Sequence, residues 1–210
     1  MKTAFKAALL AGLLGASTTC SANYCGDLAN AYGPFDYRDR GIHADSLRLV
    51  EGAHFTPEVE KLISGNRGAL GADLDYTLRA FPNHPRALTS IARLALRTKG
   101  SKVQGMKYSF ECYFNRALRF QPDDPAVHAV YGGYLSKIGR LDEAIDRLNE
   151  AVRLQPEDAT SNYNLALVYF DKKDYEKARR YARKAYELDF PLPGLKNKLI
   201  QLGKWKESAE

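Results

Sequence analysis

The fold is decided in the second half of the chain, where residues 122–158 read PDDPAVHAVYGGYLSKIGRLDEAIDRLNEAVRLQPED. Residues 159–192 follow the same pattern, as ATSNYNLALVYFDKKDYEKARRYARKAYELDFPL. Two proline-bearing joints begin at Pro122 and Pro156, which are 34 residues apart. Self-similarity at a fixed period of about 20 to 50 residues is typical of repeat proteins. We therefore expect consecutive copies of one structural unit.

Small residues recur in the two units at equivalent places. The pairs are Gly132 and Ala166, Ala144 and Ala178, and Ala151 and Ala185. Large apolar residues flank them at helical spacing, and helices approach closely only where side chains are small. Through these small-residue, aromatic and proline positions the segment resembles tetratricopeptide repeats, although His128 and Asn162 occupy the place of the family's frequent Trp. The resemblance implies an all-α, right-handed superhelix of stacked helix-turn-helix repeats.

The rest of the chain is interpreted around these two repeats. Residues 85–124 form a third repeat with six extra residues, which fall in a loop rich in Gly, Ser and Lys. The remaining segments are predicted as a degenerate helical hairpin at 56–84, an irregular N-terminal arm at 23–55 and a capping helix at 193–210. A polar outer face on a terminal helix is what a repeat stack needs in water.

Residues 1–22 have the pattern of a secretory signal. Lys2 and Lys6 precede an apolar run at 7–16, and small residues lead to a cleavage site near Ala22. The run is too short to span a bilayer, which takes about 20 apolar residues. The pattern predicts a periplasmic or secreted chain. Cys20 leaves an alternative open, a lipoprotein anchored through that residue.

Cleavage near Ala22 would leave Cys25 and Cys112 as the remaining cysteines. An even number of cysteines in an oxidising compartment favours a disulfide between them. Two free thiols are the alternative. No Cys-x-x-Cys or His-x-x-x-His spacing occurs, so we expect no metal site.

In the resembled family, the first helix of each repeat lines a concave groove that binds peptides or partner helices. Carrying the family's groove positions onto this chain gives Arg86, Arg93, Arg97, Lys137, Tyr163, Asn164, Leu167 and Phe170. The groove would change from basic at one end to aromatic and apolar at the other. Arg binds carboxylates in a bidentate fork, so this gradient suits a protein partner with acidic and hydrophobic parts.

The formal net charge of +6 is concentrated in residues 85–124, which contain 8 Lys and Arg against 3 Asp and Glu. Lys99, Lys102 and Lys107 form a basic patch in and beside the enlarged loop. Such a patch suits weak contact with an anionic membrane surface or polymer. Nucleic acid is not an expected partner of an exported chain.

Motifs of catalysis are missing from the sequence. It has no Gly-x-Ser-x-Gly, no His-Glu-x-x-His and no phosphate-binding Gly-rich loop. We therefore expect no enzyme and no cofactor, but a non-enzymatic scaffold or adaptor of the bacterial cell envelope that binds a partner segment in the groove. The alternative is a lipid-anchored or secreted component of an envelope polymer-export or assembly system, which binds an anionic surface or polymer through residues 86–119.

Overall fold

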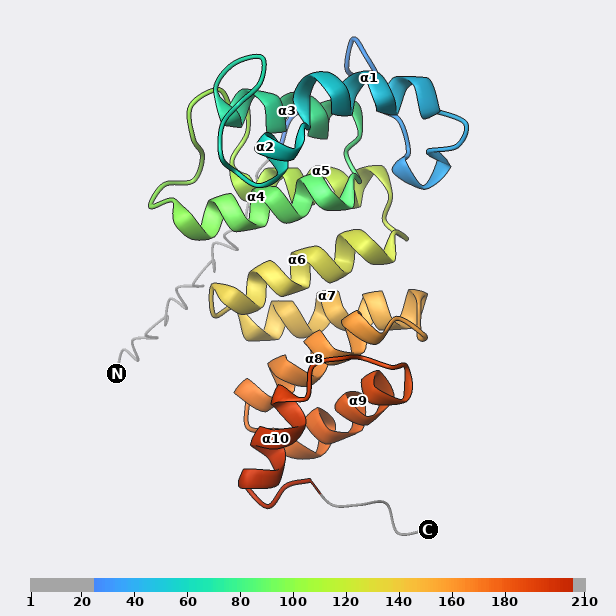
Figure 1. Cartoon of the computed structure of the whole chain (residues 1–210), viewed down its shortest axis with the longest axis vertical. Helices are drawn as coiled ribbons and strands as arrows, with labels where there is room; N and C mark the ends of the chain where they lie inside the picture. The colour runs from blue at the N-terminus through green and yellow to red at the C-terminus, as the bar shows by residue number, and fades with distance from the viewer. Residues whose placement is uncertain (1–24, 206–210) are drawn as a thin grey trace, which may run out of the picture.

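The computed structural model describes residues 25–205, and every regular element in this range is a helix (Figure 1). The elements are η1 (Tyr37–Asp39), α1 (Ala44–His54), α2 (Pro57–Glu60), α3 (Leu70–Ala80), α4 (Pro85–Arg97), α5 (Phe110–Phe120), α6 (Pro125–Lys137), α7 (Leu141–Leu154), α8 (Ala159–Asp171), α9 (Tyr175–Glu187) and α10 (Gly194–Gln201). Successive helix pairs stack along the long axis of the molecule, which confirms the predicted all-α repeat architecture. The expected signal at 1–22, with Ala22 and Cys20, lies outside the described residues.

The joints between repeats fold alike because their sequences start each first helix in the same way. The side chains of His84, Asp124 and Asp158 accept hydrogen bonds from backbone N–H groups in the first turns of α4, α6 and α8. At α4 and α6 a proline follows the cap, where its missing N–H would have had no partner in the helix. A helix thus begins at each position taken as a repeat start.

Close helix packing holds each hairpin of the second half together. A Cβ atom added to Gly132 of α6 would lie 2.6 Å from Cγ of Leu148 on α7. Ala144 and Ala151, on the same side of α7 as Leu148, are fully buried. The recurring small residues are therefore the points at which the two helices of a hairpin meet, as their spacing predicted.

His128 and Asn162, at the place of the resembled family's frequent Trp, are buried and make equivalent hydrogen bonds. Nε2 of His128 lies 2.9 Å from the carbonyl oxygen of Pro122, and Nδ2 of Asn162 donates to the carbonyl of Pro156 at 2.9 Å. Each polar side chain ties its helix to the preceding joint. The bonds compensate for burying polar groups where an apolar ring would otherwise fill space.

The N-terminal segment corrects one prediction. Residues 44–54, placed in an irregular arm, form the regular helix α1, which packs against α3. α2 is a single turn, so the first helical pair is α1 with α3 rather than a hairpin within 56–84. Only Val50 of α1 is buried, and so short an apolar face leaves almost no periodic signal in the sequence.

Residues 25–36 pack onto the first helices as an extended segment. The ring of Phe35 contacts that of Phe81 at 5.3 Å between centroids, and its N–H donates to the carbonyl of Ala80. Cys25 and Cys112 form a disulfide that fastens this segment to α5. The buried guanidinium of Arg116 donates to the carbonyl of Cys25 at 3.1 Å, and burial lowers its pKa.

A buried amide links the N-terminal segment to the first joint of the regular repeats. Nδ2 of Asn83 donates to the carboxylates of Asp36, at 2.6 Å, and Asp124, at 2.8 Å. Its Oδ1 accepts the N–H of Tyr37 at 2.9 Å. Since Asp124 also caps α6, this amide joins three successive layers of the stack.

The close approach at Gly132 generates a prediction with a neighbouring control. Gly132→Val should lower the free energy of unfolding by roughly 1–3 kcal/mol, because added methyl groups overpack the α6–α7 contact. Gly133→Ala should raise it by roughly 0.5–1 kcal/mol, because a Cβ there meets nothing within 4 Å and Ala favours the helix. Urea unfolding measures both, and equal stability of the two variants would contradict the assignment.

The disulfide should contribute to stability by closing a loop between residues 87 apart. Replacing both cysteines, as Cys25→Ala with Cys112→Ala, should lower the free energy of unfolding by roughly 2–5 kcal/mol. Thiol titration of the denatured wild type should find two more thiols after reduction than before. An unchanged count would show that the two cysteines are not bonded.

Candidate functional site

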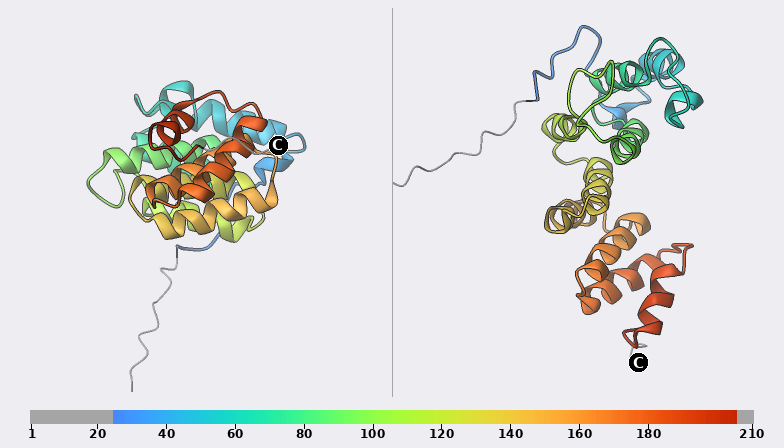
Figure 2. Two further views of the ribbon diagram at one scale, coloured as in Figure 1. Left: turned by 90° about the horizontal axis from the view of Figure 1, so that it is seen from below. Right: turned by 90° about the vertical axis from the view of Figure 1, so that its left-hand side faces the viewer.

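The predicted groove residues lie on the first helices α4, α6 and α8. Figure 2 (right) shows the stack bending, with the α6–α7 layer set back, so that the side facing the viewer in Figure 1 is concave. The first helices lie on this side and the second helices α5 and α7 on the other. We call the surface along α4, α6 and α8 the concave face.

On α4, two of the three predicted arginines are open to solvent. Arg93 and Arg97 are exposed, and neither has an ion pair or a hydrogen-bonded side chain partner within residues 25–205. Leu96, between them in sequence, is 47% exposed. The C-terminal half of α4 therefore presents two cations beside an apolar side chain.

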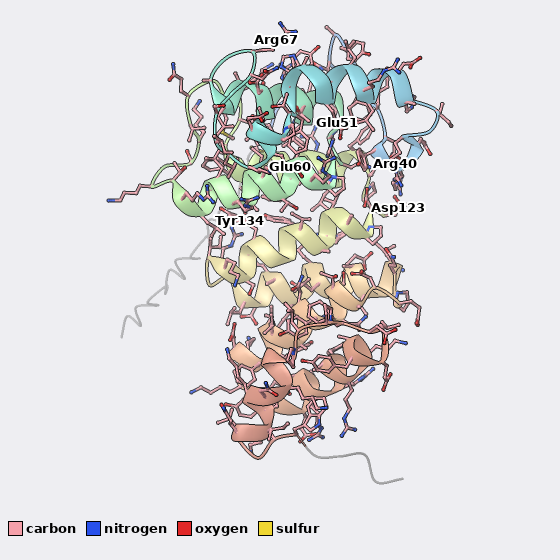
Figure 3. All side chains as sticks on the ribbon, in the orientation of Figure 1. Arg40, Glu51, Glu60, Arg67, Asp123 and Tyr134 are labelled. Atoms are coloured by element: carbon pink, nitrogen blue, oxygen red, sulfur yellow. A yellow bond between two sulfur atoms is a disulfide. The ribbon has the colours of Figure 1, made fainter. Side chains whose placement is uncertain are left out.

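Arg86 is not available in this way, contrary to its prediction as a groove residue. Its guanidinium pairs with Glu60 at 2.5 Å and with Glu51 at 3.3 Å, and it lies over the ring of Phe55. Figure 3 shows both carboxylates on the side of α4 where the N-terminal helices pack. Arg86 holds the pKa of Glu60 below its usual value. It fastens α4 to α1 and α2.

Tyr163 is also misplaced by the prediction, because the chain after α9 covers it. Its ring is 7% exposed and stacks on Phe190 at 4.0 Å between centroids. Leu195 and Leu199 of α10 are buried in the same core, so α10 caps the last hairpin as predicted. A terminal helix that shields an apolar face is what ends such a stack.

The other aromatic and apolar candidates on α8 are half-buried. Leu167 and Phe170 pack against the core, and Nζ of Lys198 on α10 lies 5.8 Å from the centre of the Phe170 ring. Asn164 is half-buried, whereas Lys137, at the end of α6, is exposed. The aromatic end of the predicted groove is thus mostly inside the molecule.

Between α4 and α8, the part of the concave face that α6 forms consists of small side chains. Ala126, Ala129, Gly133 and Ser136 recur at helical spacing and are all partly accessible. A Cβ atom at Gly133 would meet nothing within 4 Å, so the space in front of this helix is open. The accessible part of the concave face therefore runs from α4 across α6.

The enlarged loop between α4 and α5 is packed against α3 rather than projecting freely. A Cβ at Gly71 would lie 2.4 Å from the carbonyl oxygen of Gln104, and one at Gly105 would lie 2.7 Å from the Cβ of Ala72. Met106 is buried beneath the loop.

All three lysines of the basic patch lie on this loop and are exposed. The backbone N–H of Lys107 donates to Asp75 at 3.1 Å, and its Nζ lies 5.5 Å from the centre of the Tyr108 ring. Lys99 and Lys102 have no ion pair within the described residues. The loop thus offers two unpaired cations on a fixed backbone.

Two buried carboxylates on α3 have structural partners. Asp73 contacts Nδ1 of His54 at 2.8 Å and accepts the N–H of Asn66 at 2.6 Å, which fastens the preceding loop to α3. Asp75 accepts from the hydroxyl of Tyr113 at 2.6 Å and, together with burial, raises the pKa of that phenol. No three His, Cys, Asp or Glu side chains between residues 25 and 205 gather as a metal site requires.

The sequence reasoning missed a groove along the second helix of the last regular hairpin. It has a volume of about 770 Å³ and runs along α9, with Val152 and Pro156 of the preceding repeat and Asn162 on its other walls. Its cationic lining residues are Lys177, Arg179, Arg180, Arg183 and Lys184. The signal was present in the sequence, since α9 reads YEKARRYARKAYE.

No helix in the described range is both long and apolar enough to span a membrane. This finding covers residues 25–205 alone.

Comparison with known proteins agrees with this geometry. Residues 132–189 match the tetratricopeptide repeat family model. A solved structure titled as a functional characterisation of Pseudomonas aeruginosa pilF superposes with a TM-score of 0.54 at 22% identity, covering 79% of this chain and 72% of the other. That likeness concerns the fold.

Two curated relatives match parts of the chain. The TPR repeat-containing thioredoxin TTL4 of Arabidopsis thaliana is 35% identical over 32% of this chain and 10% of its own length. Human DnaJ homolog subfamily C member 7 is 27% identical over 79% of this chain and 40% of its own. The chain thus spans less than half the length of either relative. Residues 132–189 thus match the tetratricopeptide repeat family, and the stacked helix pairs agree with that match.

Proposed function

We propose that this chain is a non-enzymatic scaffold that binds a segment of a protein partner on its concave face, between α4 and α6. The observation that carries the proposal is the open space before Gly133 beside the exposed side chains of Arg93, Leu96 and Arg97. Repeat proteins use such extended concave surfaces for binding. The tetratricopeptide match at 132–189 supports an interaction role.

The chemistry of the α4 edge indicates which partner fits. The guanidinium groups of Arg93 and Arg97, which have no ion pair with residues 25–205, can each take a carboxylate through two parallel hydrogen bonds. The 47% exposed side chain of Leu96 offers apolar contact beside them. The small side chains of α6 leave room for the backbone of the partner segment to approach. A segment with alternating acidic and apolar side chains meets all three features.

The proposed site of action is the bacterial cell envelope, after export. The signal pattern at residues 1–22 supports export. The disulfide between Cys25 and Cys112 supports an oxidising compartment, since such bonds persist outside the cytosol. Cleavage near Ala22 gives a periplasmic or secreted chain, and modification of Cys20 would give a lipoprotein.

A second candidate function rests on the unpaired cations of the enlarged loop. Lys99 and Lys102 are exposed on a backbone that packs against α3, so they could contact an anionic surface or polymer as part of an export or assembly system. The full chain should then bind vesicles with anionic headgroups at 0.1 M salt and lose most binding at 1 M, where the screening length falls to about 3 Å. A lack of binding at 0.1 M salt would exclude this function.

The concave-face proposal predicts the effect of reversing two charges. Arg93→Glu with Arg97→Glu should weaken capture of the partner about 10- to 100-fold, since each lost charged hydrogen bond contributes about 1.5–3 kcal/mol. Cross-linking and pull-down from native envelopes, followed by affinity measurement on the recovered partner, provide the test.

A control with the same charge change lies on the N-terminal layer. Arg48→Glu with Arg67→Glu alters two exposed arginines, one on α1 and one in the loop before α3, neither of them on α4, α6 or α8, and should leave capture unchanged. If the Arg93 and Arg97 variant recovers the same partners as wild type with the same affinity, the concave face is not the binding site.

A further inference from the structure

The second helices of the two regular repeats carry opposite charges at equivalent positions. Moving along the chain by 34 residues converts Arg140 to Asp174, Glu143 to Lys177, Asp146 to Arg180, Glu150 to Lys184 and Arg153 to Glu187. At these five positions the signs run plus, minus, minus, minus, plus on α7 and its N-terminal joint, and minus, plus, plus, plus, minus on α9 and its joint. Each order is the same in both chain directions. Further charges lie between them, namely Asp142 and Arg147 on α7 and Glu176, Arg179 and Arg183 on α9.

These charges do not pair between the two helices inside the molecule. Several of the ion pairs are local, as between Arg140 and Glu143 at 2.5 Å and between Lys177 and Asp174 at 3.2 Å. Arg140 also pairs with Glu111 of α5, and Lys184 pairs with Glu157 in the joint before α8. No ion pair within residues 25–205 joins the α7 set to the α9 set. The cationic side chains of α9 line the groove of about 770 Å³. A helix of another molecule would have to lie in this groove to contact them.

Both charge sets are accessible to another molecule. The side chain of Glu143 is 53% exposed and that of Lys177 is 56% exposed. Asp146 and Arg180 are exposed and have no ion pair in the described part of the chain. The buried residues of the two helices are Leu148 and alanines that face their hairpin partners, so the charges point outward.

We propose that the α7–α9 face binds a second copy of this chain about a two-fold axis. Such an axis, placed between α7 and α9, lays α7 of one copy antiparallel on α9 of the other, and the reverse. The antiparallel register then faces Arg140 with Glu187, Glu143 with Lys184, Glu150 with Lys177 and Arg153 with Asp174, and it brings Asp146 within one residue of the position opposite Arg180. Each of these contacts occurs twice.

The exchange of partners costs little because the existing pairs are exposed. Exposed ion pairs contribute only about 0–1 kcal/mol each to folding, so their side chains can turn to another molecule at a small cost. Complementary charge patterns across an interface fix its register and orientation. Val152 and the half-buried ring of Tyr181 line the groove and provide apolar contact beside the charges.

Self-association is a property separate from the proposed partner binding, because it uses side chains of α7 and α9, whereas the proposed partner site uses side chains of α4 and α6. Sedimentation equilibrium of the full chain at 0.1 M salt should show a monomer–dimer equilibrium. At 1 M salt the dissociation constant should rise at least tenfold, since the screening length falls from about 10 Å to about 3 Å. A monomer at 100 µM chain, a dimer that ignores salt or a larger assembly would overturn the proposal.

Charge-reversal variants test whether α7 of a second copy occupies the groove along α9. The triple variant Lys177→Glu, Arg180→Glu, Lys184→Glu and the reciprocal variant Glu143→Lys, Asp146→Lys, Glu150→Lys should each lose at least tenfold in self-association. An equimolar mixture of the two should form dimers again, and one chain with all six changes should dimerise with itself. Recovery in the mixture also shows that both variants fold.

The matched control is Arg93→Glu with Arg97→Glu, which changes charge on the concave face and should leave the dimer intact. If either triple variant dimerises like wild type, or if the mixture stays monomeric, α7 does not occupy the α9 groove. A foreign acidic segment would then be the remaining occupant for that groove, and the proposal of a second copy fails.

Discussion

The distance between the two helices of each hairpin is the constraint on which the other features depend. At Gly132 the α6 backbone comes so near to α7 that a single added carbon would overlap Leu148. This closeness sets the thickness of a layer and turns the first helices toward one side and the second helices toward the other. The concave face and the α7–α9 face are consequences of that division, so one contact between small side chains separates two potential binding surfaces.

The N-terminal half reaches the same architecture by different means. Besides a buried apolar core, its helices are joined by polar and covalent links. Arg86 bonds α4 to the carboxylates of α1 and α2, while Asn83 connects three layers through its amide. Such links depend on single side chains, whereas the repeated hairpins depend on a periodic surface. The two halves should therefore differ in how a single substitution affects them.

This difference explains how far the sequence could be interpreted. The period between Pro122 and Pro156 is a local signal, and it predicted the helices from 85 onward. α1 escaped notice because only Val50 is buried on it. At the candidate site, Arg93 and Arg97 are exposed on α4, and their role in a groove stays a prediction. Repeat position could not show that Glu51 and Glu60, far upstream, pair with Arg86, or that Phe190 covers Tyr163. Those contacts join segments that are distant in sequence, and no repeat in the sequence indicates that they lie together in the fold.

The disulfide between Cys25 and Cys112 has a mechanical consequence. Tension applied to the chain ahead of Cys25 passes through the sulfur atoms directly to α5, and the covalent path between residues 25 and 112 carries none of it. Helices α1 to α4 lie between the two cysteines in sequence, so they belong to a covalently closed loop that bears none of the applied force. A tethered molecule under pull would therefore transmit force into the repeats while its most irregular helices stayed folded.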